Sequence, residues 1–492
     1  MPKSIWVAAA IFALLSALSA ILSTGFLETD ACTHYLSAHF ALRQPHRFLS
    51  VWDRPLFMLL YSLPAAYGGI LGARLVSLVM ALGCAWCGWR IASKLGMKRP
   101  ELAFIFVLAE PLLFLHSFAE MTELCFALLI GLAFLAYMDR RWGAMALLVA
   151  ISPLGRPEGF GFLFLAGIAL IAHRRWRWLA VLPLALLTWT TVGWVMWGQP
   201  DYGHGILNLV YWLPGQWPYS EISTYDKGPL LFWQTQQSGQ MAASFLMRLP
   251  VVVSPVFFPF MLAGTAILLW HPWQKLATHH GRCAIFAAGL PWGILAVHSY
   301  LWWRGRMASS GELRYLLVAA PLWGLLGAIG WEKAFALAAQ GQTLSSKLLA
   351  RPVLFAGIAA MLPVLANCYF HIVPLHPYDD DLLARDLSNW YLADATLQQK
   401  YPRLVASHPA VYLYLDMSPT DRNRSLVGGK SMVQQKPPGV MFVWDNVFST
   451  HNADPNMCVT EAELEANGWQ KIRPFTRNSR TWEVYLSPNP RR

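Results

Sequence analysis

The chain has 492 residues, of which 56% are hydrophobic and only 13% are charged. This composition is too apolar for a soluble protein of that length and excludes one. The formal net charge of +11 does not indicate a nucleic-acid partner, because the basic residues are scattered over short loops between apolar runs, where membrane topology accounts for them.

Long apolar runs recur along the chain from Ile5 to about His371. A bilayer core takes roughly 20 apolar residues per helix, so the runs predict a polytopic, mainly α-helical membrane bundle of about eleven spans. Because many more runs follow the first, and no small-x-small cleavage site is clean, we interpret it as an uncleaved helix rather than a signal peptide. The expected spans are 5–27, 68–91, 101–118, 121–138, 143–154, 159–173, 178–197, 248–270, 283–301, 313–331 and 352–372.

Two long segments, 28–67 and 198–247, separate some of these runs, and the residues after 372 are soluble in character. We therefore expect a membrane domain, 1–372, and a soluble domain, 373–492. Lysine and arginine mark cytoplasmic loops, and the loops "SKLGMKRP", "DRRW" and "HRRWRW" all fall on one side if the spans alternate. The expected topology is a cytoplasmic N-terminus, with both long segments and the soluble domain outside. In a bacterial inner membrane the outside is the periplasm.

The soluble domain has its own pattern. The stretches "AVYLYLDM", "GVMFVWDN" and "TWEVYLSP" are rich in β-branched and aromatic residues and predict strands. "TEAELEANGW" predicts a short helix with Thr460 as its cap and Glu463 completing a capping box. Asp379 to Asp381 are interpreted as a solvated linker. The pattern as a whole predicts a small α/β domain.

Seven cysteines are present, and they form no framework. Cys84 and Cys87 make a CxxC, "CAWC", but it lies inside an apolar run, so helix packing is the favoured interpretation. Cys32 and Cys458 fall on the same side of the membrane in the expected topology, which leaves a disulfide between them open. No His/Cys cluster has the spacing of metal ligands. We therefore predict no metal and no other cofactor.

Ionisable residues gather at the outward-facing ends of the expected spans. Charged groups at membrane depth are costly and usually face a protein interior or a cavity, so acids and arginines from several turns predict a polar cavity that opens outward. The set comprises Glu28 and Asp30 after the first span, Arg54 in the first long segment, Glu120 and Glu123 at the fourth span, Arg156 and Glu158 in "SPLGRPEGFGF", and Glu312, Arg314 and Tyr315 in "SSGELRYLLVAAP".

A purely structural interpretation of these residues stays open. An acid at the start of a helix is commonly a cap or a partner of the helix dipole, which covers Glu120, Glu158 and Glu312. The arginines can then simply be the ion-pair partners of the acids. The acids after the first span can belong to an ordinary loop.

In order and spacing, residues 5–372 resemble the GT-C superfamily of glycosyltransferases, multi-span enzymes that use sugars linked to polyprenyl phosphate. The matching features are "ETDACTHY" beyond the first span, a W-x-RP stretch in the following loop, TE-x-x-FALL at the fourth span, "RPEG", and E-x-RYLL-x-x-x-P near the last spans. Within the superfamily the chain looks like membrane mannosyltransferases and the bacterial enzymes related to lipid A aminoarabinose transferase. It has "ETD" where the latter group commonly has a "DE" pair.

The resemblance implies transfer of a sugar from a polyprenyl-phosphate donor to a glycan, lipid or protein acceptor on the outer side of the membrane. Such transfer needs a base for the acceptor's proton, and cations for the phosphate that leaves, to which arginine is well suited. Our candidate base is Asp30, with Glu28 as second choice, and inversion of the anomeric centre is expected. The candidate phosphate ligands are Arg54, Arg156 and Arg314, and the other candidate pocket residues are His34, Tyr35, Glu123, Glu158, Lys227, Glu312 and Tyr315.

Two rival functions also fit a polytopic protein with buried charges. A transporter often has internal repeats and broken central helices, and no clear repeat is present here. A non-catalytic scaffold for the assembly of cell-surface glycan is the other rival. An exchange of Asp30 for asparagine separates an enzyme from a scaffold, because only an enzyme loses turnover.

Overall fold

The computed structural model describes residues 2–50, 52–197, 238–304, 311–338, 372–421, 423–447, 449–450 and 456–490. The chain divides into two compact units, which are described separately: a helical unit, Met1–Leu22 with Ala41–Pro374, and a C-terminal unit, Ser23–Phe40 with Leu375–Arg492. The predicted span 352–372, except for its last residue, lies outside the described residues, as does most of the predicted loop 198–247.

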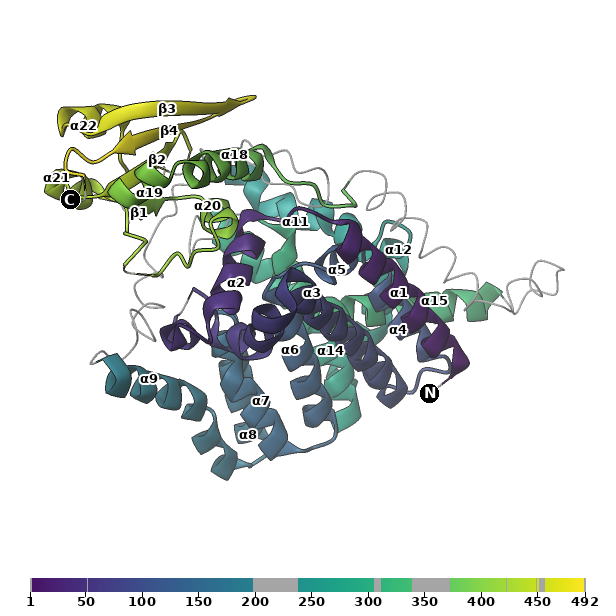
Figure 1. Ribbon diagram of the computed structural model, residues 1–492. Helices are drawn as coiled ribbons and strands as arrows, with labels where there is room; N and C mark the ends of the chain where they lie inside the picture. Colours follow the sequence, from purple (N-terminus) through teal and green to yellow (C-terminus); the bar gives the residue numbers. More distant parts are fainter. Residues whose placement is uncertain are drawn as a thin grey trace. The chain divides into compact units, whose positions relative to one another are not determined.

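The helical unit is built from α-helices and short 3-10 helices (Figure 1). In chain order they are α1 (Lys3–Leu22), η1 (Pro45–Leu49), α3 (Pro55–Lys94), α4 (Glu101–Leu108), α5 (Pro111–His116), α6 (Glu123–Met138), α7 (Trp142–Gly155), α8 (Gly159–Ala172), η2 (Trp176–Val181), α9 (Leu184–Trp197), α11 (Ser238–Val253), α12 (Phe258–Leu269), α13 (Pro272–Leu276), α14 (His279–Trp303), η4 (Leu313–Ala319) and α15 (Ala320–Ala338).

The prediction of a mainly helical membrane bundle with a small C-terminal α/β domain is confirmed. Within the described residues, five helical segments are long and apolar enough to cross a membrane, or six if the bent pair α11–α12 is one span. The apolar helices α6, α7 and α8 are shorter than that. The predicted number of about eleven spans therefore stays a prediction.

Two predicted spans are broken in the structure. The span 101–118 divides into α4 and α5 at Glu110, because Pro111 disfavours helical backbone in the residue before it. The span 248–270 divides into α11 and α12, whose axes are bent by 108°. Ser254, with a φ of 78°, and the following Pro255 lie at this second break, and neither continues a right-handed helix.

The first long loop was predicted to extend to residue 67, but helical structure occupies much of it. Helix α3 already begins at Pro55, where proline is favoured because its ring fixes a helical φ. The helix is kinked at Gly69, whose φ of 58° suits glycine. A Cβ at Gly72 would lie 2.2 Å from the Pro64 carbonyl oxygen, so the backbone is folded tightly across this kink.

Helix α15 lies at the core of the helical unit. The segment Leu313–Leu337 includes nearly all of α15, and 94% of its most apolar stretch is buried inside the protein. The corresponding share for the segment Trp176–Met196 is 17%. Glycines bring α15 close to α12: a Cβ at Gly264 would lie 1.9 Å from the Leu326 carbonyl oxygen, and one at Gly330 would lie 1.9 Å from that of Phe260. Small residues allow membrane helices to pack backbone against backbone in this way.

The C-terminal unit combines helices with a four-stranded sheet in the order β1-β2-β4-β3 (Figure 1). Strands β1 and β2 are parallel, and the pairs β2–β4 and β3–β4 are antiparallel. The elements are α2 (Thr29–Phe40), α18 (Asp379–Ala393), α19 (Ala395–Lys400), β1 (Arg403–Ala406), α20 (Pro409–Tyr414), α21 (Lys430–Gln435), β2 (Val440–Asp445), α22 (Glu461–Ala466), β3 (Gln470–Arg477) and β4 (Arg480–Leu486).

Most of the predicted elements of the soluble domain are present. The strands predicted in "GVMFVWDN" and "TWEVYLSP" are β2 and β4. Helix α22 has the predicted capping box, in which the Thr460 side chain accepts from the Glu463 amide and the Glu463 side chain accepts from the Thr460 amide. Strands β1 and β3 were not predicted from the sequence.

Two predictions in this domain are wrong. "AVYLYLDM" forms helix α20, because Pro409 occupies its first turn and the His408 ring caps the Ala410 amide. The acid run is not a solvated linker but the first turn of α18, where acids favour the helix dipole. Asp381 accepts a hydrogen bond from the Tyr378 amide at 3.0 Å, and Asp380 pairs with Arg480 at 3.4 Å.

The cysteines lie as helix packing requires. Cys84 and Cys87 are both buried on α3, and a Cβ at Gly131 would lie 3.0 Å from Cys87, so the CxxC is part of a helix interface. No disulfide joins Cys32 and Cys458 in the structure, so the pairing that the sequence left open is not formed.

Candidate functional site

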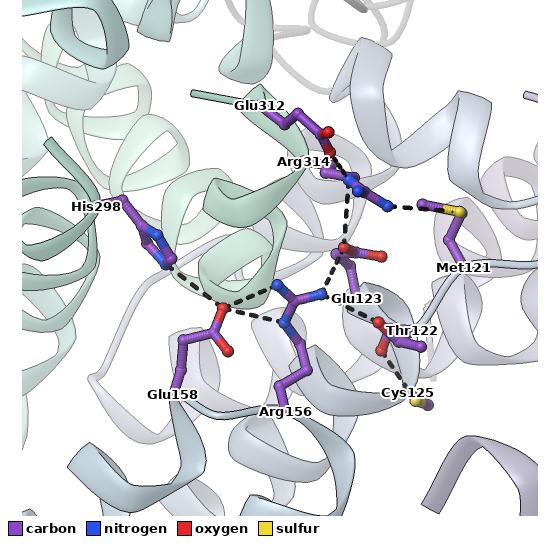
Figure 2. A network of polar contacts seen from close by, with 9 residues as sticks. All are labelled: Met121, Thr122, Glu123, Cys125, Arg156, Glu158, His298, Glu312 and Arg314. Carbon is purple, nitrogen blue, oxygen red and sulfur yellow. Dashed lines mark hydrogen bonds and ion pairs between the residues drawn. The ribbon is translucent and has the colours of Figure 1, made fainter. Parts of the chain in front are cut away.

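Charged side chains from α6, α7, α8, α14 and η4 meet in the helical unit, where α6 and α8 begin and α7 ends (Figure 2). They were expected to converge because each lies at the end of an apolar run. The structure brings together Arg54, Glu123, Arg156, Glu158, Glu312, Arg314 and Tyr315, and it adds His298 of α14. We call these eight residues the arginine–glutamate cluster.

Arg156 is at the centre of the cluster. It ends α7 in an extended conformation because Pro157 follows it. Its Nη1 lies 2.5 Å from Oε1 of Glu123 and 3.0 Å from Oγ1 of Thr122. Its Nη2 lies 2.9 Å from Oε1 of Glu158. One guanidinium group thus joins α6, α7 and the start of α8.

Glu158 links Arg156 to α14. Its Oε1 lies 3.5 Å from Nε2 of His298, whose ring stacks on Tyr315 with 5.0 Å between the ring centroids. Burial alone would raise the pKa of the Glu158 carboxyl, but the Arg156 guanidinium and His298 hold this pKa well below its usual range. The carboxyl is therefore ionised at neutral pH.

Arg314 lies on η4, at the other side of Glu123. Its Nε pairs with Glu312 and lies 3.8 Å from Oε1 of Glu123, and its Nη1 contacts the Met121 sulfur at 3.8 Å. The guanidinium carbons of Arg156 and Arg314 lie 5.4 and 5.7 Å from the ring centroid of Tyr315. Both distances are within the range of cation–π attraction.

Arg54 is the third arginine of the cluster. It precedes α3 with a φ of 59°, a backbone conformation that is uncommon outside glycine. Burial and repulsion from Arg156 lower the pKa of Arg54 to about 10, although Glu158 and Glu123 act in the opposite direction. Its charge is therefore held less favourably in the protein than in water, and an added anion would stabilise it.

The acids at helix starts are ion-pair partners rather than caps. Glu158 and Glu312 occupy the cap positions of α8 and η4, but neither side chain makes a capping hydrogen bond. Both contact arginines instead, as the structural interpretation of the sequence allowed. Glu120 does not belong to the cluster, because it pairs with Arg74 of α3.

The candidate base lies in the C-terminal unit. Asp30 is half-buried in the first turn of α2, two residues after Glu28, whose carbonyl oxygen accepts from the Ala31 amide at 3.1 Å. Farther along the helix, Tyr35 lies between Phe26 and His39, with ring centroids 6.0 and 5.7 Å away. His34 is buried on the same helix.

Sequence reasoning missed His298 and Arg74. Each is an ionisable residue inside a predicted span, and such a residue is a functional or pairing candidate by its position alone. Lys227, a predicted pocket residue, lies outside the described residues. Within the part of the chain that the structure describes, no three His, Cys, Asp or Glu side chains are grouped as a metal site requires.

Two solved structures of ArnT from Cupriavidus metallidurans are similar to the chain. The apo structure has a TM-score of 0.61 and 12% sequence identity, and the match covers 98% of this chain and 97% of that one. The structure bound to undecaprenyl phosphate has a TM-score of 0.65 and 12% identity, with 99% and 98% covered. No protein-family model and no curated protein sequence matches the chain. The chain therefore has the fold of ArnT.

Proposed function

We propose that the chain is a membrane glycosyltransferase that moves a sugar from a polyprenyl-phosphate donor to a hydroxyl group of an acceptor. Two findings support this. Nearly the whole chain has the fold of ArnT, which has been solved with undecaprenyl phosphate bound. The single observation that carries the chemistry is the gathering of Arg156 and Arg314, from separate turns, against the ring of Tyr315, with Arg54 in electrostatic contact with Arg156 and with that tyrosine.

The arginine–glutamate cluster fits a phosphate that gains charge as its sugar leaves. The formal charges of its three arginines and three glutamates cancel, so the cluster carries no net charge before a ligand arrives. An arriving phosphate adds negative charge, and Arg54 is one of the cations that can accept it, since repulsion from Arg156 acts on its charge. Arg314 supplies a second fork of donors.

We assign Arg156 a role different from that of the phosphate ligands Arg54 and Arg314. Its contacts with Glu123, Glu158 and Thr122 occupy most of its donors. We assign it to hold the cluster in shape and to add its charge to the field at the phosphate. His298, stacked on Tyr315 and facing Glu158, fixes the opposite side of the cluster.

Asp30 is the proposed base for the acceptor hydroxyl, with Glu28 as second choice. Its half-buried carboxylate in the first turn of α2 can accept a proton at a helix N-terminus. The reaction breaks the bond between the anomeric carbon and the phosphate oxygen and forms one to the acceptor oxygen. The acceptor's proton goes to Asp30, and polyprenyl phosphate leaves as the anion. Attack opposite the leaving group inverts the anomeric centre.

We place the reaction on the periplasmic side of a bacterial inner membrane, because the basic loops mark the other side as cytoplasmic. The motifs resemble those of mannosyltransferases and of enzymes related to aminoarabinose transferase, and a panel of donors distinguishes between such sugars. The acceptor is a glycan, a lipid or a protein.

The test incubates the purified chain with a panel of polyprenyl-phosphate sugars and measures the polyprenyl phosphate that is released. We expect one donor to be consumed, and Asp30→Asn to abolish most of that consumption. Asp386→Asn, at an exposed site on α18, is the matched control and keeps normal turnover. A transporter or a scaffold consumes no donor, so the proposal would be overturned if none of the donors in the panel were consumed.

A further inference from the structure

A polar cavity lies at the opposite ends of the helices that form the arginine–glutamate cluster. Helices α3 and α6 begin at the cluster and end at Lys94 and Met138, and α7 starts from that far end at Trp142. Between these far ends is a cavity of about 520 Å³. Its size is that of a small-molecule site.

Basic side chains dominate the charged lining of the cavity. Arg90 and Lys94 come from the last turns of α3, Arg141 precedes α7, and Asp139 is the acid among them. Lys94 pairs with Asp139. Among the described residues, neither Arg90 nor Arg141 is in an ion pair. The lining therefore keeps an excess of about two positive charges, which only an anion neutralises.

The rest of the lining is apolar and aromatic. Trp86 and Trp89 come from α3, and the Arg90 guanidinium carbon lies 5.5 Å from the ring centroid of Trp89. Leu132 of α6 and Leu148 of α7 lie deeper along the helices. Tryptophan is enriched where a helix leaves the hydrocarbon, next to lipid headgroups. Cations at a tryptophan belt with leucines beneath them fit a molecule that has an anionic head and an apolar tail.

We propose that this cavity binds an anionic phospholipid, with its headgroup phosphate between Arg90 and Arg141 and an acyl chain against Leu132 and Leu148. Basic pockets between membrane helices on the cytoplasmic side take anionic headgroups, and that leaflet is the one rich in anionic lipid. The loops at this end carry the basic runs "SKLGMKRP" and "DRRW", which mark it as cytoplasmic in the proposed topology. The site lies away from the arginine–glutamate cluster, so it does not depend on the proposed glycosyl transfer.

The test uses the full-length chain, stripped of lipid in a neutral detergent and titrated with phosphatidylglycerol or phosphatidylcholine under native mass spectrometry. The wild-type chain binds phosphatidylglycerol more tightly. In R90Q/R141Q this preference falls by about 25-fold, because each basic residue near the headgroup contributes about fivefold, or about 1 kcal/mol. In each of the single variants R90Q and R141Q, the preference for phosphatidylglycerol falls by about fivefold. These variants keep the test valid if the double variant misfolds.

Three further arms decide the assignment. Arg175→Gln, at an exposed arginine outside the cavity, leaves the preference unchanged. Leu148→Trp fills the apolar part and weakens phosphatidylglycerol binding with all charges kept. An excess of inorganic phosphate does not displace the lipid. The proposal would be overturned if R90Q/R141Q kept the wild-type preference for phosphatidylglycerol, or if Arg175→Gln lost as much of this preference as the cavity variants do. It would also be overturned if Leu148→Trp bound phosphatidylglycerol normally, or if inorganic phosphate displaced the lipid.

Discussion

The guanidinium group of Arg74 lies 3.1 Å from the carboxylate of Glu120, and the two side chains are only 1% and 0% exposed. Arg74 also donates to the Ala20 carbonyl oxygen at 2.7 Å, so the pair ties α1 and α3 to the turn before α6. Glu123, three residues later, faces the arginine–glutamate cluster instead. Two acids of one motif, "FAEMTELCFALL", therefore have separate tasks.

We predict that Glu120→Gln destabilises the protein without a direct effect on donor binding. Loss of one partner leaves the Arg74 cation buried and uncompensated, and such losses cost about 3–5 kcal/mol. Thermal melting in detergent measures the change. Glu465→Gln, the same exchange at an exposed position of α22, should leave the melting temperature within a degree or two. An unchanged melting temperature in Glu120→Gln would show that the pair adds no stability.

The arginines of the cluster should respond differently to exchange for lysine. Lysine keeps the charge but loses the fork of parallel donors. Arg54→Lys and Arg314→Lys should weaken binding of the lipid-phosphate donor by about 10- to 100-fold, the equivalent of one charge-assisted hydrogen bond. Arg156→Lys should also lower the melting temperature, because three of its contacts hold α6, α7 and α8 together. Normal donor affinity in both Arg54→Lys and Arg314→Lys would leave these arginines as structural ion pairs.

Asp30→Asn should lower turnover by about 10²–10⁴-fold, the usual contribution of a general base. The two side chains are nearly isosteric, so folding and donor binding should be kept. NMR of the product should show an anomeric configuration opposite to that of the donor. Retention, or near-normal turnover of Asp30→Asn, would remove Asp30 from this role and move the assignment to Glu28 or Glu123.

The pH dependence of stability should reflect the lowered pKa of Glu158. A carboxyl whose pKa is lower in the folded than in the unfolded chain stabilises the fold above the unfolded value of about 4.3, and this contribution is lost as the pH falls through the folded value. The difference in melting temperature between the wild type and Glu158→Gln should thus be constant from about pH 8 to pH 5. It should narrow only in stronger acid. A difference that shrinks near neutrality would show that Glu158 titrates there.

The proposed topology can be tested with reporters of location. A phosphatase that is active only in the periplasm, fused after Arg492, should be active, and the same enzyme inserted in the basic loop at Lys98 should be silent. A fluorescent protein that matures only in the cytoplasm should give the reverse pattern. Cytoplasmic activity at Arg492 would overturn the orientation and, with it, the proposed side of the reaction.

The sequence predicted the cluster better than it predicted the boundaries around it. An ionisable residue at the end of an apolar run is expected to face the protein interior or a cavity, because contact with lipid is costly. This argument predicted Arg54, Glu123, Arg156 and Arg314. Arg74 and His298 were not predicted as the partners of Glu120 and Glu158, because both lie inside apolar helices, far away in the chain from those acids. Helix α20 was missed because its aromatic residues suit a strand and only Pro409 and a capping histidine favour a helix.

The segment Ser23–Phe40, which carries Asp30, belongs to the same compact unit as Leu375–Arg492. The amides of Thr24 and Gly25 both donate to the Leu375 carbonyl oxygen at 2.9 Å, and the Tyr378 hydroxyl donates to the Leu27 carbonyl oxygen. A ribosome adds about 5–20 residues per second, so these partners emerge roughly 20 to 70 s after the segment that needs them. During that interval the segment Ser23–Phe40, with helix α2 and the proposed base, lacks the rest of its compact unit. A chain cut short by premature termination would therefore lack the support of Asp30 as well as its C-terminal sheet.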